Sequence, residues 1–160
     1  MAGNNQDQSL RDHVLFLLRG EGAHITFDDL VADFPAGKCG ELIDGLPYTG
    51  WQVLEHIRIA QWDILEFSRN SEHVSPKWPE GYWPGHEERG NEALWNETVE
   101  KIREDQKQIE ALVADTSTDL FARIPHGTGQ TILREALLIA DHNSYHLGAL
   151  AVMGRILKGQ

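Results

Sequence analysis

The stretch TILREALLIADHNSYHLGALAVMGRIL, residues 131–157, decides the fold because it is the most apolar part of the chain. Polar residues inside it argue against a membrane span, where a charged group is costly. We therefore predict a long helix that packs within a bundle, and its polar residues become informative exceptions to an apolar pattern. These exceptions are Arg134, Glu135, Asp141, His142, Asn143 and His146.

Three further long helices and one short helix are predicted upstream of this run. Ser9, followed by Asp12, is a suitable N-cap for the first helix, and Thr49 with Gln52 forms a capping-box pattern before another. Apolar residues recur at helical spacing in these segments, with charged residues on the opposite face. The predicted helices are residues 10–19, 28–34 (the short one), 50–70 and 91–114.

Together these segments predict an all-α fold, namely an antiparallel up-down four-helix bundle with a short extra helix. We expect one domain over residues 1–160, with residues 1–8 flexible. The connection 71–90, between the second and third long helices, is rich in Pro and Trp. Its prolines forbid a continued helix, and its aromatic rings are costly to leave in water. We expect it to fold back over one end of the bundle as a packed cap; a pocket lid or dimer surface is the alternative.

Composition excludes several classes of protein. Hydrophobic residues make up 41% and charged residues 24%, as in ordinary globular domains. The net charge of -11, without a Lys/Arg cluster, would repel nucleic acids and anionic membranes, so we expect neither partner. Cys39 is the single cysteine, which leaves no internal disulfide and no cysteine metal cluster. No signal peptide is visible at the N-terminus, so we expect a cytoplasmic protein.

Three histidines form the candidate site. His142 and His146 are four residues apart, so both project from one helix face and can bind one metal ion. That face is otherwise apolar, where unpaired imidazoles would be costly unless a metal or hydrogen bonds satisfied them. His56 lies in the middle of the second long helix and would complete a three-nitrogen site if it met the pair across the bundle. Zinc or nickel suits such ligands; histidines hydrogen-bonded to backbone or carboxylates are the alternative.

The same residues carry a resemblance to a known family. The run Trp51-Gln-Val-Leu-Glu-His56 resembles the first ligand motif of the DinB/YfiT-like superfamily, and residues 131–148, with His142, His146 and Gly148, are similar to its second motif. The resemblance implies an antiparallel four-helix bundle, a three-histidine metal site and, often, a homodimer. It also implies a small-molecule substrate, because members include transferases and isomerases that use low-molecular-weight thiols. Other members are assigned only as metal-dependent hydrolases.

Two carboxylates are candidate catalytic residues. Glu135 lies seven residues before His142, and Asp63 lies seven residues after His56. Each offset returns to nearly the same helix face about 10 Å along the axis, too far for metal ligation but within reach of a pocket. Either could act as a base or a substrate anchor; a surface or capping carboxylate is the commoner role. Cys39 has no visible activating partner, so we do not expect it to be a nucleophile.

We interpret the sequence as a metal-dependent enzyme that activates a water or a low-molecular-weight thiol, of the thiol-dependent transferase or isomerase type or the hydrolase type. The alternative is a non-catalytic, metal-stabilised bundle that binds a small ligand or a partner. A third possibility is a plain helical bundle whose histidines bind no metal. Family analogy contributes to this ranking and does not prove function.

Overall fold

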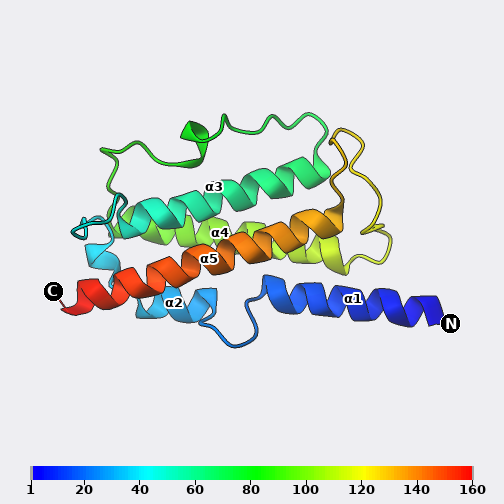
Figure 1. Cartoon of the computed structure of the whole chain (residues 1–160), viewed down its shortest axis with the longest axis horizontal. Coiled ribbons are helices and arrows are strands. Elements are labelled where there is room, and N and C mark those ends of the chain that lie inside the picture. Colours follow the sequence, from blue (N-terminus) through cyan, green and yellow to red (C-terminus); the bar gives the residue numbers. More distant parts are fainter. Residues whose placement is uncertain (1, 160) are drawn as a thin grey trace.

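Helices form nearly all of the regular structure in the computed structural model, which describes residues 2–159, with side chains from residue 5 onward. No strand occurs in these residues, so the predicted all-α class is confirmed. Two short 3-10 turns, η1 (Ala36–Lys38) and η2 (Glu80–Tyr82), lie in the connections. The helices are α1 (Ala2–Leu18), α2 (Phe27–Asp33), α3 (Gly50–Arg69), α4 (Glu92–Ala114) and α5 (Ile132–Gly159) (Figure 1).

The predicted and observed helix starts agree at the helices that begin with a capping side chain. At α3, the backbone N–H of Gln52 donates to the Thr49 hydroxyl, and the Thr49 N–H donates to the Gln52 side chain, which completes the capping box. Asn91 caps α4, and Thr26 caps α2. These side chains satisfy backbone donors that the first helical turn leaves free. Local sequence therefore sets three of the five helix starts.

The first helix begins earlier than we predicted, at Ala2 rather than Leu10. Ser9 consequently lies inside α1 and is not its N-cap. Side-chain pairs four residues apart support the helix across this point, since Gln8 donates to Asp12 at 2.9 Å and Arg11 pairs with Asp7 at 2.8 Å. Residues 2–8, which we expected to be flexible, thus belong to the helix, and residue 1 lies outside the described residues.

Helices α3 and α4 run parallel, which corrects the strictly up-down order that we expected. Hydrogen bonds between them join Trp51 to Thr98 near the start of both helices and Gln61 to the carbonyl of Ile102 further along. Both residue numbers rise together, as two helices running in the same direction require. Figure 1 shows the same relation, with both helices running from one end of the molecule to the other.

The connection 70–91 explains the parallel pair. A helix of 20 residues, the length of α3, rises about 30 Å, and a connection of similar residue count reaches back over that distance with ease. In Figure 1 the connection returns along the outer side of α3 to the start of α4. It therefore covers the flank of α3. We had expected it to close one end of the bundle, which it does not do. Long crossover connections of this kind permit parallel neighbours in helical bundles.

Packing is antiparallel between α3 and α5 and between α1 and α4, whereas α1 and α5, which also contact each other, run in the same direction. Arg11 donates to the carbonyl of Val113, and Gln106 donates to the carbonyl of Leu18, so α1 and α4 run in opposite directions. In Figure 1, α1 and α2 follow each other along one edge of the bundle, separated by the segment 19–26. Among the described residues, no helix combines the length and apolar character needed to cross a membrane.

The core lies between the helices in two main clusters of buried side chains. One centres on α3, α4 and α5 beside α2, and includes Leu54, Ile57 and Leu150, each 0% exposed. The other packs α1 against α4 and α5, and includes Val14 and Ile139. Helices α3 and α5 contribute to both clusters, so their positions are fixed along most of their length. Side chains on the facing surfaces of this pair are thereby held in a rigid frame.

Candidate metal centre

His56 on α3 meets His142 and His146 on α5. One ring nitrogen from each histidine lies within 4.8 Å of the others. The Nε2 atoms of His56 and His142 are 3.1 Å apart. Tetrahedral zinc ligands at 2.0–2.1 Å from the ion would be about 3.3 Å from one another, so this spacing is close to that of ligands sharing one metal. The antiparallel pairing of α3 and α5 thus brings all three predicted ligands together.

All three imidazoles are held in the neutral form that binds metals. Burial lowers the pKa of His56 and of His142 below the ordinary histidine value. Burial also lowers the pKa of His146, to about 4, and the positive charges that its two partners would carry add to this effect. At pH 7 the group is therefore three neutral imidazoles, which is the protonation state that metal ligation requires.

The loop before α4 orients His56. Its Nδ1 donates to the backbone carbonyl of Tyr82 at 2.7 Å, so the proton is on Nδ1 and the Nε2 lone pair points toward the other histidines. Trp83 stacks on the imidazole at a centroid distance of 3.9 Å, and Tyr48 stacks on Trp83 at 4.0 Å. The Pro/Trp-rich connection is therefore one wall of the site. Sequence reasoning did not identify the hydrogen-bond partner of His56, because a carbonyl far along the chain has no side-chain signature.

His142 leaves an unsatisfied polar atom. Its Nδ1 is buried and has no hydrogen-bond partner among the residues that the structure describes. Ligation through Nε2 would fix the proton on this nitrogen, and ligating histidines ordinarily place that N–H near an acceptor. Burial lowers the pKa of His142, and the Asn143 side chain and the Asp141 carboxylate partly oppose this effect. The residues present fit a nitrogen-ligated divalent ion.

Asp63 and Glu135 are both buried, at 6% and 3% exposure, which corrects the view that the surface was their commoner place. Both line a cavity of about 340 Å³ that His56 and His142 also border. Neither belongs to the group of possible metal ligands, as their distance along the helices predicted. The two carboxylates therefore lie beside the histidines in one cavity, although their chemical surroundings differ.

Asp63 is an anchor for the connection 70–91. It accepts hydrogen bonds from the Tyr82 hydroxyl and from His73 Nε2, the latter at 2.7 Å. Burial and the bond to Asp63 raise the pKa of Tyr82 to about 12, so its hydroxyl remains a donor at neutral pH. The same segment that Asp63 holds supplies the carbonyl that binds His56. Sequence reasoning missed His73 and Tyr82, which are separated from Asp63 by a helix end and a loop.

Glu135 is the second buried carboxyl group of this cavity. Burial raises the pKa of its carboxyl group, and the nearby charge of Asp63 raises it further, while the adjacent Arg134 opposes both effects. Arg134 also pairs with Glu135 directly, with a side chain that is 58% exposed at the cavity mouth. A carboxyl group with a raised pKa in a cleft is a frequent feature of catalytic sites.

A second, more apolar cavity borders the histidines from the side of His146. It has a volume of about 420 Å³. Its walls combine Trp83 from the connection with apolar residues from the segment before α3, α3 itself and the second half of α5. They include Leu46, Tyr48, Val53, Tyr145, Ala149 and Met153. The histidine group thus borders two cavities of different polarity.

Cys39 and His126, two further residues that could carry chemistry, both have structural surroundings that explain them. Cys39 is fully buried, and burial raises the pKa of its thiol to about 11, which agrees with the expectation that it is not a nucleophile. His126 donates from Nε2 to the carbonyl of Phe67 at 2.7 Å and does not line the cavities beside the metal-ligand candidates.

Comparison with known proteins identifies the family. A family model described as the DinB superfamily matches residues 9–150, which include all five predicted site residues. No curated protein and no solved structure matched the chain. The family model covers most of the chain, and the chain therefore belongs to the DinB superfamily.

Proposed function

We propose that this DinB-superfamily protein is a metal-dependent enzyme whose His56, His142 and His146 hold a divalent transition metal, zinc or nickel. The observation that carries the proposal is the convergence of three neutral imidazoles within 4.8 Å at the border of two cavities. Three protein ligands leave at least one coordination position for water or substrate, as in catalytic zinc sites. A closed structural site would use a fourth protein ligand.

Two cavities favour a reaction between two molecules. A bound metal would lower the pKa of a thiol or a water and so supply a nucleophile near neutral pH. The polar cavity, with Arg134 at its mouth, suits a low-molecular-weight thiol that carries charged groups. The apolar cavity beside His146 suits the body of an electrophilic substrate. We therefore rank thiol transfer or thiol-dependent isomerisation above hydrolysis, which needs room for one organic molecule only.

Glu135 is the residue that we propose for proton transfer. Its buried carboxyl group, with a raised pKa, can accept the proton that leaves the nucleophile and return it to the product. Asp63 is already occupied by Tyr82 and His73, so we assign it a positioning role. By holding the Tyr82 segment, Asp63 keeps the carbonyl in place that orients His56.

The first test is the metal content of the purified, untagged protein beside a His142→Ala/His146→Ala variant. We expect about one metal per chain in the wild type and none in the variant, as elemental analysis by mass spectrometry would report. His126→Ala is the matched control, because this histidine binds the Phe67 carbonyl outside the cluster. Absence of metal from the wild-type protein, even after incubation with zinc or nickel, would contradict the proposal.

The second test separates an enzyme from a binding module. The metal-loaded protein is incubated with model electrophiles together with thiols, and separately with ester and amide panels. Consumption of thiol and electrophile in equal amounts supports the transferase, and cleavage without thiol supports the hydrolase. Metal binding and metal-dependent melting without turnover of any of these compounds would favour the non-catalytic module.

A further inference from the structure

The polar cavity beside the three histidines is charged differently at its mouth and in its interior. The carboxyl groups of Asp63 and Glu135 lie inside, on side chains that are 9% and 4% exposed. The side chain of Arg134, which also lines the cavity, is 58% exposed. A ligand that enters from solvent therefore meets the guanidinium group of Arg134 before it meets either carboxyl group.

The guanidinium group of Arg134 has one edge without a protein partner. Its Nη1 donates to the Glu135 carboxyl group, and its side chain forms no other hydrogen bond with the residues that the structure describes. The N–H groups of Nε and Nη2, which lie side by side in the guanidinium plane, are therefore available to an acceptor. This pair of donors matches the two oxygens of a carboxylate.

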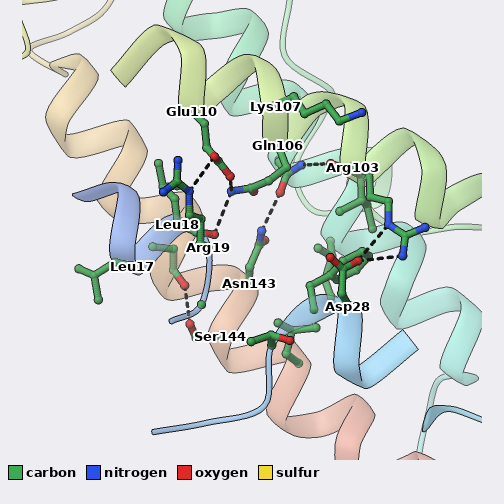
Figure 2. Close-up of a pocket in the computed structure, with 18 of the residues that line it drawn as sticks. Leu17, Leu18, Arg19, Asp28, Arg103, Gln106, Lys107, Glu110, Asn143 and Ser144 are labelled. Atoms are coloured by element: carbon green, nitrogen blue, oxygen red, sulfur yellow. Dashed lines mark hydrogen bonds and ion pairs between the residues drawn. The ribbon is translucent and has the colours of Figure 1, made fainter. Parts of the chain in front are cut away.

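Arg103, at a separate cavity of about 310 Å³ between the end of α1 and the start of α2, shows the opposite case. It donates from Nε and Nη2 to the Asp28 carboxylate and from Nη1 to Glu100, so both edges of its guanidinium group have partners. Figure 2 shows the pair with Asp28. Arg134 differs because the edge that Arg103 uses for Asp28 has no acceptor among the described residues.

The two carboxyl groups inside the polar cavity already have protein donors. Asp63 accepts from the Tyr82 hydroxyl and from His73, and Glu135 accepts from Arg134. Neither needs a cationic ligand to satisfy it. A cationic group at the mouth would also be repelled by Arg134 and by a metal ion held on the histidines. The mouth therefore suits an anionic group.

Aromatic and apolar side chains form other parts of the wall. Trp78, from the connection 70–91, lines the cavity and is 69% exposed. Phe67 of α3 and Leu138 of α5 line it as well. An indole ring with this exposure offers a flat apolar surface, and covering it removes apolar area from water. The ligand that suits this wall has a flat, apolar body.

The spacing along α5 sets the length of such a ligand. Arg134 lies eight residues before His142, which corresponds to about 12 Å along the helix axis. A metal–sulfur bond of about 2.3 Å and a hydrogen bond of about 2.9 Å account for part of this distance. The atom bound to the metal and the carboxylate should therefore be about 7 Å apart.

We propose that the molecule that enters the polar cavity carries a carboxylate at the end remote from the metal, and that Arg134 binds this carboxylate. The apolar body of the molecule covers Trp78, and its other end reaches the metal. Arg134 is then a specificity-determining residue that contacts substrate. This inference rests on the function proposed above for the end of the molecule at the metal, whereas the contact with Arg134 can be measured with or without metal.

The test uses cobalt-loaded protein and two thiols of nearly equal size, 4-(sulfanylmethyl)benzoate and 4-(sulfanylmethyl)benzamide. A thiolate bound to cobalt gives a charge-transfer absorption band in the near ultraviolet, so affinity is measured without turnover. We expect both thiols to give the band and the carboxylate to bind about five- to tenfold more tightly, the effect of a charge-assisted hydrogen bond at a partly exposed site. Equal affinities, or tighter binding of the amide, would overturn the proposal.

A variant series isolates the contribution of Arg134. The charge of Glu135 is removed first, so that the Glu135→Gln variant is compared with the Glu135→Gln/Arg134→Leu variant. We expect the preference for the carboxylate to remain in the first and to disappear in the second. Arg155→Leu in the same background is the matched control, because Arg155 is exposed on α5 and lines neither cavity beside the histidines. A preference that persists without Arg134, or is lost with Arg155, would contradict the assignment.

Trp78→Ala tests the contact with the body of the ligand. Both thiols present the same ring to the indole, so we expect both to bind about three- to tenfold more weakly and the preference for the carboxylate to remain. Circular dichroism checks that the variant is folded. Unchanged affinity of both thiols would contradict the placement of the ligand body against Trp78.

Absence of the absorption band with both thiols would mean that the proposed metal function has failed. The contact with Arg134 is then measured in metal-free protein with 4-methylbenzoate and 4-methylbenzamide, by following the indole N–H signal of Trp78 in NMR titrations. Tighter binding of 4-methylbenzoate would support the proposal. Equal affinity of the two compounds, or no binding of 4-methylbenzoate at millimolar concentration, would overturn it.

Discussion

The α3–α5 pair presents a histidine face, with His56 and His142, and an amide face, with Gln61 and Asn143, which lines a separate cavity of about 310 Å³ between the end of α1 and the start of α2. His56 and His142 point toward the proposed metal centre, whereas Ile57 and Asn143, the next residues, line the cavity at the break between α1 and α2. One residue turns the side chain by about 100° around the helix, so neighbours in sequence belong to different sites. Both faces contain buried polar side chains, which are satisfied in different ways.

On the amide face, Gln61 and Asn143 satisfy each other and a backbone carbonyl, and one acceptor remains. On the histidine face, burial keeps three imidazoles neutral, and one ring nitrogen from each lies within 4.8 Å of the others. Because buried polar groups need partners, the number and type of polar atoms without a protein partner indicate the kind of ligand. Three converging nitrogen ligands suit a metal ion.

The largest expected effect comes from Glu135→Gln, which tests whether the histidine face is catalytic. The amide cannot exchange the proton, so we expect kcat for the activity found in the screen to fall about 10²- to 10⁴-fold. Metal content should stay unchanged. Glu97→Gln is the control, since the side chain of Glu97 is exposed and pairs with Lys101. Full activity in Glu135→Gln would remove this residue from the mechanism.

Gln61→Leu breaks the amide face and should lower the free energy of unfolding by about 2–4 kcal/mol. It leaves the Ile102 carbonyl and the Asn143 amide N–H without their partner in a buried position. Urea unfolding measures the change, and metal content should be retained. Gln8→Leu at the exposed start of α1 should change stability by no more than about 0.5 kcal/mol. A similarly small effect at Gln61 would mean that water replaces the amide.

A pH series distinguishes the faces because only one of them titrates. In metal-free protein the folded-state pKa of His146 is about 4, below the ordinary value near 6.5 that applies to the unfolded chain. The unfolded chain therefore binds more protons between these values, and the free energy of unfolding falls as pH decreases from 6.5 toward 4. We expect a loss of roughly 2 kcal/mol by pH 5. His146→Gln should reduce this slope, leaving the contributions of His56 and His142, whose pKa values are also lowered, whereas Gln61→Leu should lower stability at every pH and leave the slope unchanged.

The smallest expected effect is that of Arg103→Ala at the rim of the amide face. Its pair with Asp28 is solvent-exposed, so we expect a loss of no more than about 1 kcal/mol in thermal unfolding experiments. The loss should shrink further in high salt. A loss of several kcal/mol in the free energy of unfolding would show that the ion pair, and not the apolar packing of α2, keeps α2 in place.

The helix boundaries show how far local sequence determines the fold. Thr49 and Asn91 specify where α3 and α4 begin because each side chain binds a backbone N–H only three residues away. The start of α1 was misjudged because Ser9 has the chemistry of a cap, while pairs such as Gln8–Asp12 continue the helix through it. The direction of α4 was misjudged because a connection of some 20 residues can return along a helix as readily as it can close an end.

The sequence by itself determined that the protein is helical and that His142 and His146 share one helix face, since helical spacing and caps are local properties, whereas the approach of His56 to this pair depends on the packing of α3 against α5. Only the tertiary structure decided which atom orients His56, that Asp63 holds the Tyr82 segment, and that Asn143 Oδ1 is left without a partner. Each of these depends on contacts between residues far apart in the chain. Such contacts follow from the packing of α3 against α4 and α5 and from the path of the connection 70–91, which no local pattern encodes.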